Sequence, residues 1–164
     1  MPEKETIERA REDAREGKSP STQAGEFVRE EIHHIREGKH GARSAQQAIA
    51  IGLSKARRAG VKLRVPKKGT TSEETRRAAV RDSRKAKSGG KKKTSARRSR
   101  AMLKRLKREG RSAASPQALA RQARSAARRR SAASRSASAK KAARTKGPAK
   151  RRAAAKKGAR TRAR

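Results

Sequence analysis

The sequence lacks cysteine, tryptophan and tyrosine, and it has a single phenylalanine, Phe27. Without cysteine the chain forms neither a disulfide framework nor a thiolate metal site, so it gives no sign of an oxidising compartment. Without other aromatic side chains it has no platform on which exposed bases could stack. Acidic residues are scarce too, with 14 Asp and Glu against 51 Lys and Arg. These absences argue against a secreted disulfide scaffold and against base-stacking recognition.

Long apolar runs and catalytic motifs are also missing. No run approaches the roughly 7 to 15 apolar residues of a signal peptide or the ~20 of a membrane span, so we expect no membrane association and a cytoplasmic, nucleoid location. The chain has no GKS or GKT phosphate loop and no nucleophile elbow. The Gly-Gly-Lys-Lys-Lys-Thr stretch at 89–94 superficially resembles a phosphate loop, but no buried strand is expected before it. We therefore interpret it as a flexible basic linker. We therefore predict a protein without enzymatic activity and without a cofactor.

Positive charge is what the sequence has in excess, and it is unevenly distributed. The formal net charge is +37 at pH 7. Residues 1–66 carry 14 basic and 10 acidic side chains, whereas the remainder carries 37 basic and four acidic ones, with none after Glu109. Cations without partners inside the chain must stay solvated or meet an external polyanion, and nucleic acid is the commonest one in a cell. We expect duplex DNA to be preferred through its charge density, with RNA also bound.

Apolar residues mark out the folded part. Eleven large apolar residues precede Pro66, if the initial Met1 is left aside, and only five follow it. The composition predicts a mainly α protein with a small N-terminal helical module at 1–66, in which any folded domain should lie. A basic linker with one polar helix is expected at 67–94. The Lys/Arg/Ala/Ser-rich tail at 95–164 is expected to be disordered or transiently helical when free.

Helix boundaries are signalled by caps. The glycines at 17, 38 and 60 each follow a helical pattern and fit C-caps. A peripheral first helix is expected over about residues 3–16, a second after the N-cap Ser19 and a third after the N-cap Ser44. The alternating run at 61–66 predicts an extended segment that lies across the helical pair or joins a second subunit. Further helices are predicted at about 71–87 and, amphipathic and basic, at about 95–109.

The predicted nucleic-acid contacts are the clustered basic residues of the middle and tail, which have no compensating acids nearby. They are Arg57, Arg58, Lys62, Arg64, Lys67, Lys68, Lys91, Lys92, Lys93, Arg97, Arg98, Arg100, Lys104, Arg105, Arg128, Arg129, Arg130, Lys140, Lys141, Lys150, Arg151, Arg152, Lys156 and Lys157. Residues 19–65 are expected to hold a second copy of the chain, a protein partner or DNA, and the sequence leaves these open.

Two histidines raise the question of a metal site. Glu30, His33, His34 and Glu37 stand at i, i+3, i+4 and i+7, a spacing that includes the Glu-x-x-His pair of carboxylate-bridged sites. Such sites take matching ligands from other helices, and this chain has no second helix with histidine unless subunits associate. We therefore assign no metal site and interpret Glu30 and Glu37 as ordinary helix-surface partners of the histidines.

Two resemblances bear on function. The block QQAIAIGLSKARRAG at 46–60 resembles the core of a small bacterial domain family of unknown function, over roughly residues 10–65, whose members often end in basic tails. The tail is similar in composition to bacterial histone H1-like DNA-binding proteins. That likeness implies a nucleoid-associated protein that compacts or protects DNA without sequence specificity. An RNA- or ribosome-associated protein, or a protein-interaction adaptor localised by its tail, remains the alternative.

Overall fold

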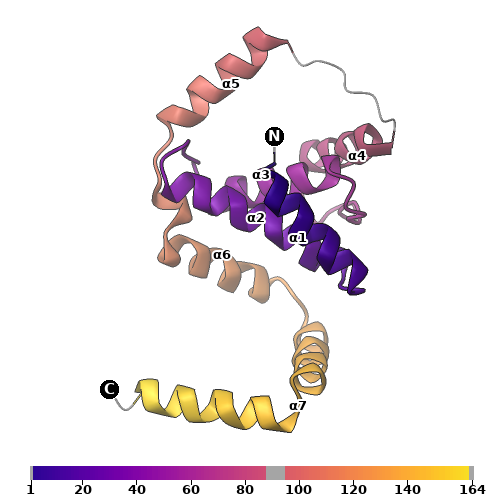
Figure 1. Cartoon of the computed structure of the whole chain (residues 1–164), viewed down its shortest axis with the longest axis vertical. Helices are drawn as coiled ribbons and strands as arrows, with labels where there is room; N and C mark the ends of the chain where they lie inside the picture. Colours follow the sequence, from indigo (N-terminus) through magenta and orange to yellow (C-terminus); the bar gives the residue numbers. More distant parts are fainter. Residues whose placement is uncertain (1, 88–94, 163–164) are drawn as a thin grey trace. The chain divides into compact units, whose positions relative to one another are not determined.

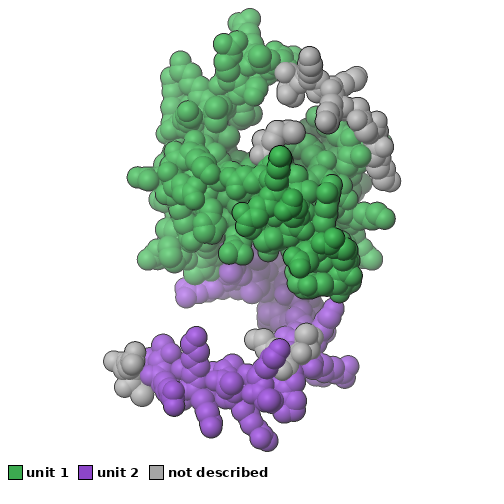
Figure 2. All heavy atoms as spheres, viewed as in Figure 1, with its two compact units in different colours: residues 1–120 green, residues 121–164 purple. Residues whose placement is uncertain are grey.

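The computed structural model describes residues 2–87 and 95–162, and every regular element in these ranges is a helix (Figure 1). The mainly α prediction is thereby confirmed. The elements are α1 (Lys4–Arg15), α2 (Pro20–Arg36), α3 (Ala45–Arg58), α4 (Glu73–Lys87), α5 (Ala96–Arg108), the 3-10 turn η1 (Ser112–Ala114), α6 (Pro116–Arg128) and α7 (Ala132–Arg162). Within the described ranges, none of these helices combines the length and apolarity that a membrane crossing requires. The chain divides into two units, 1–120 and 121–164 (Figure 2).

The predicted caps form as expected. The Ser19 hydroxyl accepts a hydrogen bond from the Thr22 amide at 3.4 Å, and the Ser44 hydroxyl accepts one from the Gln47 amide at 3.2 Å. The three C-cap glycines have φ angles of 70°, 79° and 98° at Gly17, Gly38 and Gly60. This left-handed conformation carries no steric cost for glycine, so each helix stops where the sequence predicts.

In the first unit, α2 packs between α1 and α3, and α4 packs on α3. The core around Phe27 contains Ala10, Ala24 and Ala56. Val61 and Leu63 pack against this core, so the extended segment lies across the helices of its own chain, which is one of the two arrangements expected for it. A Cβ on Gly52 would stand 2.7 Å from the Val28 Cα, which shows how closely α2 and α3 approach.

A second core cluster shows that the prediction of a folded domain ending before Pro66 is wrong. Ala113 and Ala114 of η1 are buried against Ile32 and Ile35 of α2, and Leu119 packs on the same cluster. The prediction failed because only large apolar side chains were counted, whereas this contact is made largely by alanine. We call residues 106–119 the docking segment.

Backbone hydrogen bonds hold the docking segment to the loop after α2. The Gly41 amide donates to the Leu106 carbonyl at 2.9 Å, and the Ala42 amide donates to the Gly110 carbonyl at 3.1 Å. The Arg36 guanidinium also donates to a docking-segment carbonyl, that of Ala114, at 3.0 Å. The two partners meet so closely that a Cβ on Gly41 would lie 1.8 Å from the Glu109 carbonyl oxygen.

The tail that was expected to be disordered or only transiently helical is instead α-helical over most of its described length. Of its helices, α5 exposes every side chain except a half-buried Leu106. The longest helix, α7, is interrupted at Gly147, where φ is 67°, just before Pro148. Alanine has the best intrinsic helix propensity, so an alanine-rich segment can become helical without a core. The prediction gave too much weight to repulsion between like charges.

Candidate functional site

Two neighbouring carboxylates of α2 are buried, contrary to the surface role predicted for Glu30. The side chain of Glu30 is 2% exposed and that of Glu31 is 1% exposed. Lys55 reaches both from α3, with its Nζ 3.1 Å from Glu30 Oε1 and 2.6 Å from Glu31 Oε2. Burial alone would lower the pKa of Lys55, but hydrogen bonding and charge attraction from Glu31 and then Glu30 outweigh it and raise that pKa. Lys55 therefore stays cationic between two carboxylates.

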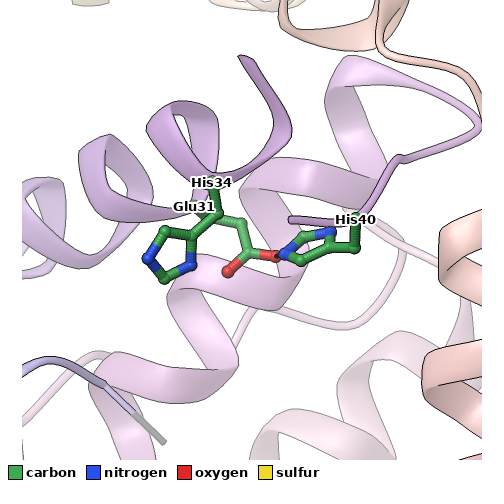
Figure 3. A group of neighbouring side chains, drawn as sticks. All are labelled: Glu31, His34 and His40. Atoms are coloured by element: carbon green, nitrogen blue, oxygen red, sulfur yellow. Dashed lines mark ion pairs between the residues drawn. The ribbon is translucent and has the colours of Figure 1, made fainter. Parts of the chain in front are cut away.

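Two histidines join this pair of carboxylates, as Figure 3 shows for Glu31, His34 and His40. The Nε2 of His40 lies 3.1 Å from Glu31 Oε1, and the His34 and His40 rings meet edge to face with centroids 6.1 Å apart. The side chains of His34 and His40 are 13% and 12% exposed. One ligand atom from each of Glu31, His34 and His40 lies within 4.8 Å of the other two. We call these three residues the histidine–carboxylate cluster.

A further carboxylate approaches the cluster from the residue that precedes α1. Glu3 Oε1 lies 2.8 Å from His34 Nε2 and 3.3 Å from Lys39 Nζ. Hydrogen bonds from His34 and then Lys39 lower the pKa of Glu3. Glu3 is therefore an ionised acceptor for the outer nitrogen of His34.

The local fold explains why these residues meet. Glu31 and His34 are three residues apart on α2, which places them on the same helix face. The left-handed Gly38 reverses the chain after α2 and returns His40 to that face. The docking segment then holds the loop, because Gly41 is hydrogen-bonded to Leu106.

Among the residues considered for a metal site from the sequence, Glu30 and His34 belong to this network, while His33 and Glu37 are exposed. The sequence pattern does not indicate Glu31 and His40, because neither stands at the i, i+3, i+4 and i+7 spacing that joins Glu30, His33, His34 and Glu37. His40 lies in a loop, and the signal that could have revealed it is the glycine turn two residues earlier.

The predicted nucleic-acid contacts are exposed wherever the structure describes their side chains, with one exception. Arg57 is only 9% exposed, and this burial lowers its pKa, partly offset by Asp82, so Arg57 is corrected from a contact to an interior residue. Arg58 is half exposed, with its Nε 3.8 Å from Asp82. Lys91, Lys92 and Lys93 lie outside the described residues.

The predicted amphipathic basic helix corresponds to α5. Seven of its 13 residues are Lys or Arg. Met102 and Leu103 are 56% and 45% exposed between these cations. The helix therefore presents mixed apolar and basic side chains, with the apolar part confined to a short stretch.

Comparison with known proteins yields one match. Residues 21–69 match a family model described as a family of unknown function (DUF6496), in agreement with the resemblance seen in the sequence. No curated protein and no solved structure matches the chain. The match covers α2, α3 and the extended segment, and it includes Glu31, His34, His40 and Lys55, whereas the basic tail lies outside it.

Proposed function

We propose that the chain binds nucleic acid without sequence specificity, with duplex DNA preferred, through exposed cations of α5, α6 and α7, and thereby compacts or shields DNA in the nucleoid. The observation that carries this proposal is the second unit, where residues 121–164 contain 18 basic and no acidic residues. Every basic side chain described in this unit is exposed. The charged side chains of this unit are therefore all positive.

The mechanism is the release of condensed counterions from the phosphate backbone. Each Lys or Arg that neutralises a phosphate frees a counterion, and this entropy gain drives binding. If about 10 phosphates are neutralised, the logarithm of the binding constant should fall with the logarithm of salt concentration at a slope near −9 on duplex DNA. Binding is then tight at low salt and weakens steeply as salt rises.

The lack of sequence specificity follows from the same helices. No aromatic side chain is available in the tail for stacking on bases. Arginine can read guanine edges, but only when a scaffold aims it into a groove. The cations of α7 are distributed around the helix rather than along one face, so they suit phosphate contact. The compositional likeness of the tail to histone H1-like proteins supports the same interpretation.

The proposal can be tested with the full chain and a fluorescent DNA duplex in a salt series. Replacement of Arg128, Arg129 and Arg130 by glutamine should weaken binding and reduce the salt slope by up to about 2.7, since each lost phosphate contact removes about 0.9. The matched control replaces the same three residues by lysine, which keeps the charge and should keep the slope. Wild-type binding that is insensitive to salt would overturn the electrostatic mechanism.

A competition experiment separates DNA from RNA as the target. Unlabelled DNA duplex should displace the labelled duplex at lower concentration than unlabelled ribosomal RNA of equal phosphate content. If the RNA competes better, the RNA-associated alternative replaces the proposed preference. If neither the labelled duplex nor the ribosomal RNA binds the chain, the adaptor alternative, in which residues 19–65 bind a protein partner, is favoured.

A further inference from the structure

We propose that Glu31, His34 and His40 bind one Zn²⁺ ion, or a transition-metal ion of similar preference, with water in the remaining position. This inference goes beyond nucleic-acid binding and does not depend on it, because none of the three residues is among the proposed phosphate contacts. Two imidazole nitrogens and one carboxylate oxygen form a ligand set that Zn²⁺ takes with an open fourth position.

The geometry requires only a small adjustment to close on an ion. The three ligand atoms lie within 4.8 Å of one another. A tetrahedral ion with bonds of about 2.0 to 2.2 Å would hold them about 3.3 to 3.5 Å apart. Side-chain rotations of His34, at the end of α2, and of His40, in the following loop, can cover this difference without a change in the fold.

The strongest evidence is the environment of the two imidazoles. The outer nitrogen of His34, Nε2, lies 2.8 Å from the Glu3 carboxylate, which leaves Nδ1 on the side of Glu31 (Figure 3). The Nδ1 of His40 lies 3.1 Å from the Gly41 carbonyl oxygen. A carbonyl only accepts, so this nitrogen carries the proton and Nε2 faces Glu31. Histidines that bind metals almost always donate their other ring N–H to a carboxylate or carbonyl in this way.

The surroundings of the Glu31 carboxylate also favour a bound cation. Lys55 Nζ contacts Glu31 Oε2 at 2.6 Å, while Oε1 is the oxygen that faces His40. Neither oxygen of Glu31 makes a hydrogen bond of regular geometry, although both are buried. A buried carboxylate in this condition is costly, and a metal ion on the Oε1 side would satisfy it.

The local charge balance favours a cation too, although the chain as a whole is strongly positive. Glu3, Glu30 and Glu31 converge here, against the cations Lys39 and Lys55. Lys39 is also shared with Glu37, whose Oε2 lies 3.1 Å from its Nζ, so with neutral histidines these groups keep a net negative charge. A proton on His40 would also compensate it, and a plain imidazolium–carboxylate pair is the competing explanation that the experiment must separate.

The expected consequence of binding is stabilisation of the loop after α2. Two ligands come from α2 and the third from the loop, which is hydrogen-bonded to the docking segment. An ion bound by all three would tie α2 to this loop and, through it, hold residues 106–119 in place. Because the ion binds only the folded chain, it should raise the unfolding temperature.

The test uses the full chain, freed of nucleic acid at high salt and of metal with a chelator. Zn²⁺ is titrated in, and both calorimetric stoichiometry and unfolding temperature are measured. The variants are His40→Asn, whose amide nitrogen can replace Nδ1 as donor to Gly41, and His34→Gln, whose amide can replace Nε2 as donor to Glu3. Each removes a metal ligand and keeps the outer hydrogen bond. The matched control is His33→Asn, which alters the exposed neighbour of His34.

Wild type and His33→Asn should bind one Zn²⁺ per chain and unfold at a higher temperature with it. His40→Asn and His34→Gln should remain helical and lose more than about 100-fold in affinity, beyond the 10- to 100-fold typical of outer-shell partners. Glu3→Gln should fall within that outer-shell range. Equal Zn²⁺ binding by all variants, or no stoichiometric binding by wild type, would overturn the proposal and leave the imidazolium–carboxylate pair.

Discussion

Helices α2 and α7 form for different physical reasons, although both are stable elements of one chain. Helix α2 buries Phe27 and Ile35 against its neighbours and has a serine N-cap and a glycine C-cap, so tertiary packing supplies most of its stability. Helix α7 buries no large side chain and consists mainly of alanine, lysine, arginine and serine, so its stability comes from intrinsic propensity. The first unit should therefore unfold cooperatively, and the second should melt gradually.

The two units also treat charge differently. In the first unit most acids have a basic neighbour within the fold, as the pairs of Arg9 with Glu26 at 2.8 Å and Lys18 with Asp13 at 2.7 Å show. The second unit contains 18 basic residues and no Asp or Glu. Ion pairs therefore contribute to the structure of the first unit, whereas in the second unit every described basic side chain is exposed.

The largest change in the free energy of unfolding should come from truncating the chain before or after the docking segment. A chain that ends at residue 120 keeps the docking segment and should unfold like the full protein. A chain that ends at residue 109 loses Ala113, Ala114 and Leu119 and uncovers Ile35. We expect it to be less stable by about 3 to 5 kcal/mol, through lost apolar burial and the lost Arg36 hydrogen bond. Urea denaturation followed by circular dichroism measures this, and equal midpoints for the two lengths would show that the docking segment is not part of the core.

A point substitution in the full chain can reproduce that loss. In Gly41→Ala the new Cβ would overlap the Glu109 carbonyl, where only backbone could move, so the docking segment should detach at a cost of about 3 kcal/mol. The matched control is Gly110→Ala, because a Cβ at Gly110 meets nothing within 4 Å. Proteolysis should cut near residue 110 faster in Gly41→Ala than in Gly110→Ala. Equal rates would contradict the close packing of the loop.

Loss of the buried cation should cost nearly as much. Lys55→Met leaves Glu31, which is 1% exposed, without its ammonium partner, and we expect a loss of about 3 kcal/mol in the free energy of unfolding. Lys39→Met is the control, because Lys39 is 53% exposed and solvent screens its pairs with Glu3 and Glu37, so its loss should cost far less than the loss of Lys55. Similar losses in the two variants would mean that burial does not distinguish the two lysines.

Much of the first unit could be predicted from the sequence because its signals are local. The N-caps Ser19 and Ser44 and the glycine stops are decided by hydrogen bonds within a few residues, and the structure confirms them. The docking segment could not be found in the same way. Alanine is common both in cores and in exposed helices, so Ala113 and Ala114 carry no signal until their partner is known.

Only part of the candidate site could be predicted from the sequence, again because the rest depends on contacts between distant residues. Helical periodicity selected His34 and Glu30, which share a face, but it cannot place a residue beyond the end of the helix. His40 returns to that face only through the turn at Gly38 and the contact with residues 106–110. Glu31 resembles a surface residue by type, and its burial depends on Lys55 from another helix. Both depend on contacts between distant parts of the chain.

A smaller change in stability is expected from alanine substitutions at two helical glycines, and its sign should differ between them. Gly52→Ala would place a Cβ 2.7 Å from the Val28 Cα, so the α2 and α3 helices must separate, at a cost of about 1 to 3 kcal/mol. Gly25→Ala places its Cβ in open space within α2 and should stabilise the unit by about 0.8 to 1 kcal/mol through helix propensity. The measurement is the urea midpoint of each variant. A shift of the same sign for both would show that α2 and α3 are not tightly packed at Gly52.

The smallest effect on the stability of the first unit should come from a substitution in the second unit. An alanine-to-glycine change in α7 can be compared directly with the same change in a packed helix of the first unit. Ala154→Gly, at an exposed position of α7, should weaken that helix locally by about 1 kcal/mol and lower the helical circular dichroism signal. The cooperative unfolding midpoint of the first unit should not move, because the residues of its two core clusters all precede position 120. Ala48→Gly is the counterpart, since Ala48 is 0% exposed within α3. That change should lower the midpoint, because it adds a cavity to the same loss of propensity. If Ala154→Gly shifted the midpoint as much as Ala48→Gly, the two units would unfold together, and the second unit could not owe its helices to composition alone.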